Sequence, residues 1–163
     1  EDLSVLFRAS LNQSSDQPVL LAEELALCQK YVHIESLRLD ERLQVNWHIN
    51  VDPQTVKIPL LTLQPLLENA IYHGIQPLPE GGVVEVVIDR YDNKLVASIS
   101  NPLPDAIEAP LQGNRMALDN IRRRLEAIYG ASASIVSRKD EAIFNTTISY
   151  PLDDESARGN RRR

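Results

Sequence analysis

The chain has 163 residues, of which 43% are hydrophobic and 25% are charged, and its formal net charge is −6. This length and composition predict one globular domain that is large enough to bury a core of its own. The single cysteine, Cys28, excludes a disulfide framework and a multi-cysteine zinc site.

Residues 1–17 are predicted to form the end of a preceding helix and a linker. Helical character from Leu3 to Leu11 gives way to the polar residues 12–17. The chain opens on Glu1-Asp2 without an initiator methionine, which predicts a fragment of a longer protein. No apolar run approaches the roughly 20 residues that span a bilayer, so neither an anchor nor a signal peptide is expected in these residues.

The first predicted core elements are a helix and a strand. Apolar residues recur at steps of four, three and four from Leu21 onward and predict an amphipathic helix that runs to about Leu39. Residues 43–49 alternate between apolar and polar types and predict a half-buried strand. His48 falls on the polar face of that strand and is predicted to lie at the surface.

The next predicted helix runs from Leu60 to about Tyr72 and is apolar over much of its circumference. We expect it to be buried against a sheet and to close at His73-Gly74, with glycine in the helix-stop position.

The remaining elements complete a two-layer pattern. In chain order they are a hairpin of strands over 83–88 and 95–99, a proline-rich loop over 101–114, a helix over 118–128 that Gly130 ends, and strands over 132–137 and 143–150. Antiparallel hairpins mixed with helices that must cover one face predict an α/β (α+β) two-layer sandwich. A mixed β-sheet would then be covered on one face by three helices.

Charge is unevenly distributed along the chain. Four of the 17 basic residues lie among the last six residues, at Arg158, Arg161, Arg162 and Arg163. The remaining body carries 13 basic against 23 acidic residues, which argues against a phosphate-backbone binder and hence against a nucleic-acid partner. Residues 153–163 are predicted to form a disordered basic tail.

The densest polar cluster in an apolar segment is Glu68-Asn69 together with His73. Asn69 and His73 are four residues apart and project from one helical face, with Glu68 about 100° away. One interpretation is that these groups cap or bridge neighbouring elements. The other is an oxygen-rich face that holds Mg²⁺, since hard cations prefer carboxylate and amide oxygens.

A second candidate is the junction of loop and helix at Gly113, Asn114 and Arg115. Free backbone N–H groups at a helix start favour phosphate oxygens, and Arg115 would add a charge-assisted contact. The alternative is that this helix start binds only water. Arg122-Arg123-Arg124, on the polar side of the helix, is interpreted as a solvated face.

The order of these motifs resembles a known family. Residues 58–74, IPLLTLQPLLENAIYHG, closely resemble the segment iPpllLQPLvENAikHG of the LytS/AlgZ (FimS)-type sensor histidine kinases. Two further stretches agree with that family. The first precedes this segment and consists of Leu21-Ala22-Glu23-Glu24-Leu25, Tyr31, Ile34-Glu35, Arg38 and Arg42-Leu43. The second follows it and consists of Asn120-Ile121-Arg122-Arg123-Arg124-Leu125 and Tyr129-Gly130.

The resemblance implies a Bergerat-type ATP-binding fold of the GHKL superfamily, spanning residues 18–152. It implies that ATP, held with Mg²⁺, donates its γ-phosphoryl to a histidine on an upstream dimerisation domain, for relay to a response regulator. The whole protein would be a homodimer, and this chain would be the cytoplasmic domain of an inner-membrane sensor. None of His33, His48 and His73 stands in a phosphoacceptor motif, so that histidine is expected upstream, beyond residues 1–17.

The resemblance also assigns roles to single residues. Asn69 matches the Mg²⁺-binding asparagine of the N box and Glu68 the adjacent catalytic carboxylate, while His73-Gly74 match the end of that box. Asn101 takes the place of the adenine-binding aspartate. The later glycine box of the family matches Gly113, Asn114, Arg115 and Leu118, which would contact the nucleotide.

Two departures from the family pattern leave a second hypothesis open. The sequence Asn101-Pro102-Leu103-Pro104 lacks the aspartate and both glycines of the D-x-G-x-G box, and Gly113 is one glycine of three in the later box. Side chains at the positions of the missing glycines hinder the close approach of the backbone to a phosphate group. The chain is thus either an ATP-binding kinase domain or a degenerate Bergerat-fold module that docks a response regulator or a kinase partner.

Overall fold

A five-stranded mixed sheet forms one layer of the protein. The computed structural model describes residues 17–104 and 112–152, and its sheet has the order β2-β4-β5-β7-β6. The strands are β2 (Leu43–Ile49), β4 (Gly82–Tyr91), β5 (Lys94–Pro102), β6 (Ser134–Lys139) and β7 (Ile143–Pro151). β2 runs parallel to β4, and the other neighbours are antiparallel. The predicted mixed sheet is therefore confirmed.

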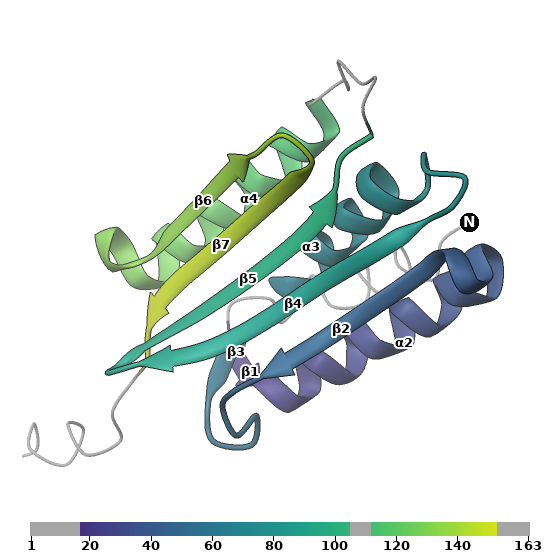
Figure 1. The fold of residues 1–163 in the computed structure, drawn as a ribbon. Coiled ribbons are helices and arrows are strands. Elements are labelled where there is room, and N and C mark those ends of the chain that lie inside the picture. The colour runs from purple at the N-terminus through teal and green to yellow at the C-terminus, as the bar shows by residue number, and fades with distance from the viewer. Residues whose placement is uncertain (1–16, 105–111, 153–163) are drawn as a thin grey trace, which may run out of the picture.

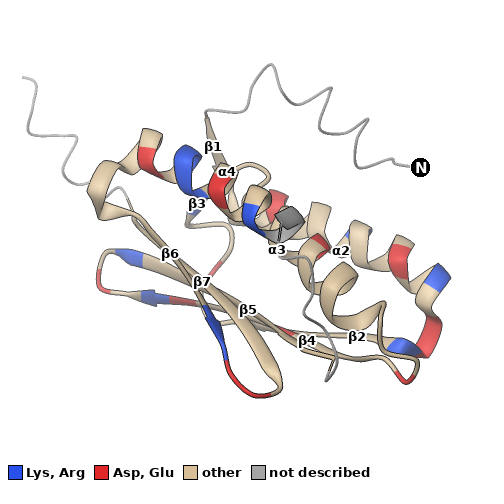
Figure 2. Cartoon of the chain, turned by 90° about the horizontal axis from the view of Figure 1, so that it is seen from above, with Lys and Arg blue, Asp and Glu red and all other residues tan. Residues whose placement is uncertain are grey.

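Three helices form the second layer, and all of them cover the same face of the sheet (Figures 1 and 2). They are α2 (Leu21–Leu39), α3 (Leu63–Ala70) and α4 (Gln112–Tyr129). Short helical turns follow each of them, namely the 3₁₀ turns η1 (Asp40–Arg42) and η3 (Gly130–Ser132) and the π-helical turn η2 (Ile71–Ile75). This arrangement is the predicted two-layer sandwich. Within the described ranges, none of the helices combines the length and hydropathy needed to cross a membrane.

The core lies between the two layers. Side chains of alternating strand residues point toward the helices, among them Val84, Val86 and Ile88 of β4 and Leu95, Ala97 and Ile99 of β5. The other face of the sheet is polar. On it His48 Nε2 lies 2.8 Å from Glu85 Oε2, and both side chains are exposed, as predicted for His48.

A second, two-stranded sheet was not predicted. β1 (Pro18–Leu20) pairs antiparallel with β3 (Lys57–Pro59), and Val19 lies opposite Ile58. Strands of three residues are too short to carry a period-two signal, and here long-range pairing rather than local pattern defines them. The pair ties the start of α2 to the segment that leads into α3.

α3 begins three residues later than predicted. Leu61 has φ 59°, a left-handed conformation that no helix continues through, and the first helical residue is Leu63 rather than Leu60. The helix also does not stop at His73-Gly74 as predicted, because it continues as η2 to Ile75 and Gly74 has no positive φ. Gly130, by contrast, has φ 63° directly after α4 and ends it as predicted.

Several predictions fall on residues outside the described ranges. They concern the end of a preceding helix and the linker as far as residue 16, the part of the 101–114 loop from 105 to 111, and the basic tail of 153–163.

Candidate functional site

α3 and η2 together carry the polar cluster singled out in the sequence. Glu68 and Asn69 lie on α3, and both are half-buried. The Gln64 side chain donates a hydrogen bond to Glu68 Oε1 at 3.4 Å. The segment therefore holds carboxylate and amide oxygens at the boundary between core and solvent, a donor set that suits a hard cation such as Mg²⁺.

His73 lies within η2 beside an exposed aromatic ring. Its ring centroid is 4.9 Å from that of Tyr72, and the two rings meet edge to face. Burial lowers the pKa of His73 below its ordinary value of 6.5. The imidazole is thus mainly neutral at pH 7, with one nitrogen able to donate and the other to accept a hydrogen bond.

Gly74 and Asn101 are brought into direct contact, although they are far apart in the sequence. Asn101 is 5% exposed and lies near the end of β5, where its Nδ2 donates to the carbonyl oxygen of Pro102 at 2.9 Å. A Cβ placed on Gly74 would lie 2.5 Å from Asn101 Nδ2 and 2.7 Å from its Cβ. Glycine is required at position 74 by this close approach, not by the termination of a helix.

This contact yields a double-mutant prediction. Gly74→Ala should destabilise the fold by about 1–3 kcal/mol, the usual cost of overpacking a tight contact. In an Asn101→Gly background the clashing atoms are gone, and we expect less than half of that cost to remain. Urea unfolding of the wild type, the two single variants and the double variant measures the coupling. An equal cost of Gly74→Ala in both backgrounds would contradict the assigned contact.

The predicted residues of the later glycine box lie at the beginning of α4. The side chains of Gly113 and Asn114 are outside the described residues, although α4 begins at Gln112. Arg115 is exposed, and Leu118 is half-buried and packs against the core. The structure thus brings Asn101 to the segment of Glu68, Asn69, His73 and Gly74 by way of its contact with Gly74.

Glu24 of α2 has a structural role that its sequence motif did not reveal. Its side chain is 0% exposed, and its carboxylate accepts hydrogen bonds from four successive backbone N–H groups. The distances are 2.8 Å from Leu61, 3.0 Å from Thr62, 2.9 Å from Leu63 and 3.2 Å from Gln64. Burial raises the pKa of Glu24 above its ordinary value, and the four N–H donors reduce that rise by favouring the ionised form.

Arg124 corrects the prediction of a solvated arginine face on α4. Its guanidinium donates to the carbonyl oxygens of Leu60 and Leu61, at 2.7 Å for Leu61, and it is half-buried. Arg122 and Arg123 are exposed as predicted. Helical periodicity placed all three on the polar side but could not indicate that the loop before α3 lies within reach of the third.

The fold is that of the catalytic domains of histidine kinases. The catalytic domain of histidine kinase ThkA matches with a TM-score of 0.62 at 15% identity, over 83% of this chain and 94% of that one. The cytoplasmic segment of histidine kinase QseC matches with a TM-score of 0.58 at 14% identity, over 91% of this chain and 92% of that one.

Sequence comparison narrows this class. The sensor histidine kinase YpdA of Escherichia coli is 30% identical over 82% of this chain, and the sensor protein LytS of Oceanobacillus iheyensis is 31% identical over 82%. A family model described as histidine kinase matches residues 1–43. The chain is related to the LytS-type sensor histidine kinases, and it spans about a quarter of the length of these two relatives, 25% in each case.

Proposed function

We propose that the chain is the ATP-binding catalytic domain of a two-component sensor histidine kinase. In this proposal it presents ATP so that the γ-phosphoryl passes to a histidine of an upstream dimerisation domain, with ADP as the other product. The observation that carries the proposal is the contact of the Asn69–Gly74 segment with Asn101 at the end of β5, because the segment resembles the N box of the family and Asn101 stands at the place of its adenine-binding aspartate. A full-length histidine kinase of related fold, ShkA, was solved in complex with AMPPNP, and it matches with a TM-score of 0.57 at 18% identity.

The roles of the residues follow from their chemistry. The Asn69 amide oxygen would bind Mg²⁺, and Glu68 beside it would add a carboxylate to the metal site. Mg²⁺, when bound, neutralises charge on the phosphates during transfer. The Asn101 amide oxygen would accept a hydrogen bond from the adenine amino group, while Gly113, Asn114, Arg115 and Leu118 would line the phosphate side. His73 and Gly74 would shape the pocket wall.

The whole protein would act as a homodimer in a membrane, with this domain on the cytoplasmic side. Its phosphorylated histidine would then pass the group to an aspartate of a response regulator. These partners are inferred from the family relationship, and no nucleic-acid partner is expected for the acidic body of the chain.

A degenerate module that docks a response regulator or a kinase partner is the second candidate. The observation in its favour is that Asn101 and Pro102 at the end of β5 make close contacts within the protein. Asn101 Nδ2 is bonded to its neighbour's carbonyl, and Pro102 packs so closely on Gly82 that a Cβ there would lie 2.8 Å from Pro102 Cγ. An asparagine also lacks the charge with which the family's aspartate holds adenine.

Titration calorimetry with ATP separates the two candidates. We expect saturable binding to the 163-residue chain when Mg²⁺ is present, and binding weakened by about tenfold or more when EDTA removes the metal. A folded sample that releases no heat at millimolar ATP and Mg²⁺ would refute the kinase-domain proposal. The same sample would then be titrated with a response regulator, for which the second candidate predicts binding.

A further inference from the structure

Both ends of the α3–η2 segment are held by charged side chains from other elements. At its N-terminal end the Glu24 carboxylate of α2 accepts the N–H groups of residues 61–64, which have no helical partner of their own. Arg124 of α4 donates to the carbonyl oxygens of Leu60 and Leu61 in the same turn. An anion at the N-terminus of a helix also complements its dipole.

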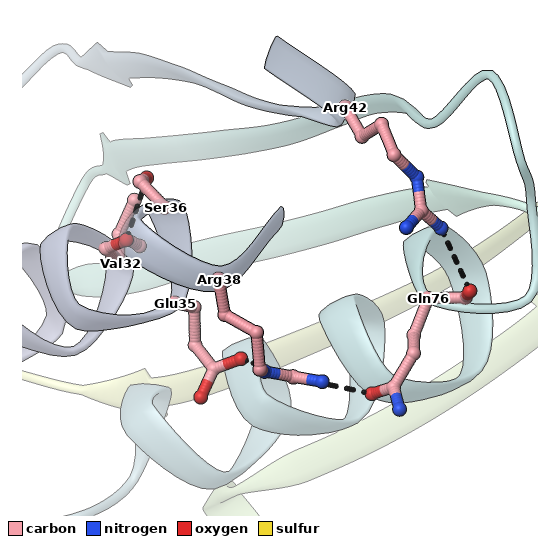
Figure 3. A network of polar contacts seen from close by, with 6 residues as sticks. All are labelled: Val32, Glu35, Ser36, Arg38, Arg42 and Gln76. Atoms are coloured by element: carbon pink, nitrogen blue, oxygen red, sulfur yellow. Dashed lines mark hydrogen bonds and ion pairs between the residues drawn. The ribbon is translucent and has the colours of Figure 1, made fainter. Parts of the chain in front are cut away.

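The other end is held by Arg42, which immediately precedes β2. Its guanidinium donates to the carbonyl oxygen of Gln76 at 2.9 Å and to that of Leu78 at 2.7 and 3.2 Å. Arg38 reaches Gln76 Oε1 at 3.3 Å and pairs with Glu35. Figure 3 shows the guanidinium groups of Arg38 and Arg42 both pointing at Gln76.

Gln76 is also the residue that closes the π-helical turn. Its backbone N–H donates to the carbonyl oxygen of Ile71 at 2.9 Å, a step of five residues instead of the four of an α-helix. A turn of this kind is rare because it is less favourable than an α-helical one, and it persists where other contacts support it. Arg42 binds the carbonyl of the same residue whose N–H makes the π-type hydrogen bond.

The wider turn determines where Gly74 lies. Relaxing η2 to α-helical geometry would shift the register of every residue after Ala70 and rotate Gly74 relative to Asn69. Gly74 is buried against the Asn101 side chain in the observed geometry, with no space for even a methyl group. The position of the turn is therefore coupled to the position of Asn101.

We propose that Arg42 and Glu24 are positioning residues for the nucleotide site. They hold the two ends of α3–η2 so that Asn69 and Gly74 keep their places relative to Asn101. The effect on nucleotide affinity rests on the proposed function, whereas the effect on geometry is measurable in the nucleotide-free chain.

The test compares Arg42→Met with Tyr150→Phe in the 163-residue chain. Tyr150→Phe is the matched control, because it also removes a donor to a backbone carbonyl, that of Lys57 at 2.7 Å. Tyr150 pairs with Leu95 at the opposite end of β5 from Asn101. Amide NMR shifts and hydrogen exchange are recorded without nucleotide, followed by ATP affinity with Mg²⁺ and thermal unfolding.

For Arg42→Met we expect shifted Gly74 and Gln76 amide resonances and exchange of the Gln76 amide accelerated by about tenfold. ATP affinity should fall by about tenfold, the loss that corresponds to one charge-assisted hydrogen bond.

Arg42→Lys should lie between wild type and Arg42→Met in each of these measurements, because an ammonium group lacks the forked guanidinium that reaches two carbonyls. It supplies the same readouts where Arg42→Met does not fold. Tyr150→Phe should lower the melting temperature while Gly74 and Gln76 keep wild-type shifts and affinity stays within about twofold.

Glu24→Gln tests the other end with nearly unchanged volume. It should shift the amide resonances of residues 61–64 and of Asn69. Unchanged Gly74, Gln76 and Asn69 resonances in the variants would overturn the proposal, as would an affinity loss no larger than that of Tyr150→Phe. A wild-type chain that does not bind ATP would refute the proposed function alone, and the amide shifts and exchange would still decide the positioning role.

Discussion

Replacing Asn69 with alanine is expected to remove the Mg²⁺-dependent part of ATP binding. The amide oxygen is the proposed metal ligand, and alanine supplies no oxygen in its place. We expect affinity for ATP in the presence of Mg²⁺ to fall by at least about tenfold, to the level of the wild-type chain in EDTA. Calorimetric titrations with and without Mg²⁺ measure both quantities.

Two companion variants sharpen the Asn69 experiment. Asn69→Asp restores an oxygen ligand and should retain Mg²⁺ dependence, whereas alanine should not. Asn46→Ala is the control for loss of an asparagine, since Asn46 lies on the polar face of the sheet and donates to Glu85 at 3.0 Å. Asn69→Ala with wild-type Mg²⁺ dependence, in a sample that unfolds at the wild-type temperature, would refute the assignment.

Replacing Gly81 with alanine is expected to have the largest effect on stability. Gly81 has φ 73°, and a Cβ there would overlap the carbonyl oxygen, Cα and carbonyl carbon of Arg42. β2 and β4 begin side by side, with Leu43 opposite Gly82. The added Cβ would therefore contact the backbone of the segment before β2, and neither of the two paired segments can shift without the other. Left-handed strain and overpacking together should cost about 3 kcal/mol or more.

Gly130 provides the control for the strain component. It has φ 63°, but a Cβ placed there would meet no atom within 4 Å. Gly130→Ala should therefore cost only the left-handed strain, about 1–2 kcal/mol. Urea unfolding monitored by circular dichroism gives both values. Equal costs for the two variants would show that the contact with Arg42 contributes nothing.

The regular elements of the fold were largely predictable from local pattern. The step of three and four residues from Leu21 predicted α2 with the observed end at Leu39, and the β-branched run before Asp92-Asn93 predicted the β4–β5 hairpin. Both signals are periodicities of consecutive residues, which depend on how one element faces the core. The pair β1 and β3 was missed because three residues contain no such period.

The residues of the candidate site were proposed from the sequence, whereas their arrangement came only from the tertiary structure. Glu68 and Asn69 stood out as polar groups in an apolar helix, and the family resemblance added Asn101. The predicted start of α3 at Leu60 was wrong. Glu24, which lies 37 residues before Leu61, accepts the backbone N–H groups of the turn that precedes the helix, and local sequence does not reveal this contact. The prediction that Gly74 ends the helix was also wrong. Glycine is needed there because the Asn101 side chain lies close to it, and not because of its neighbours along the chain.

The sequence by itself determined the order of helices and strands, the class of fold and the family motifs, because these depend on the spacing and type of residues over short stretches. Only the tertiary structure decided which charged side chains hold the α3–η2 segment. Glu24, Arg42 and Arg124 each bind backbone atoms at least 34 residues away, and the geometry of those contacts exists only once the layers have packed. The length and composition of the chain predicted a single domain with a core, and packing then placed three charged groups at the ends of the segment that carries the candidate site.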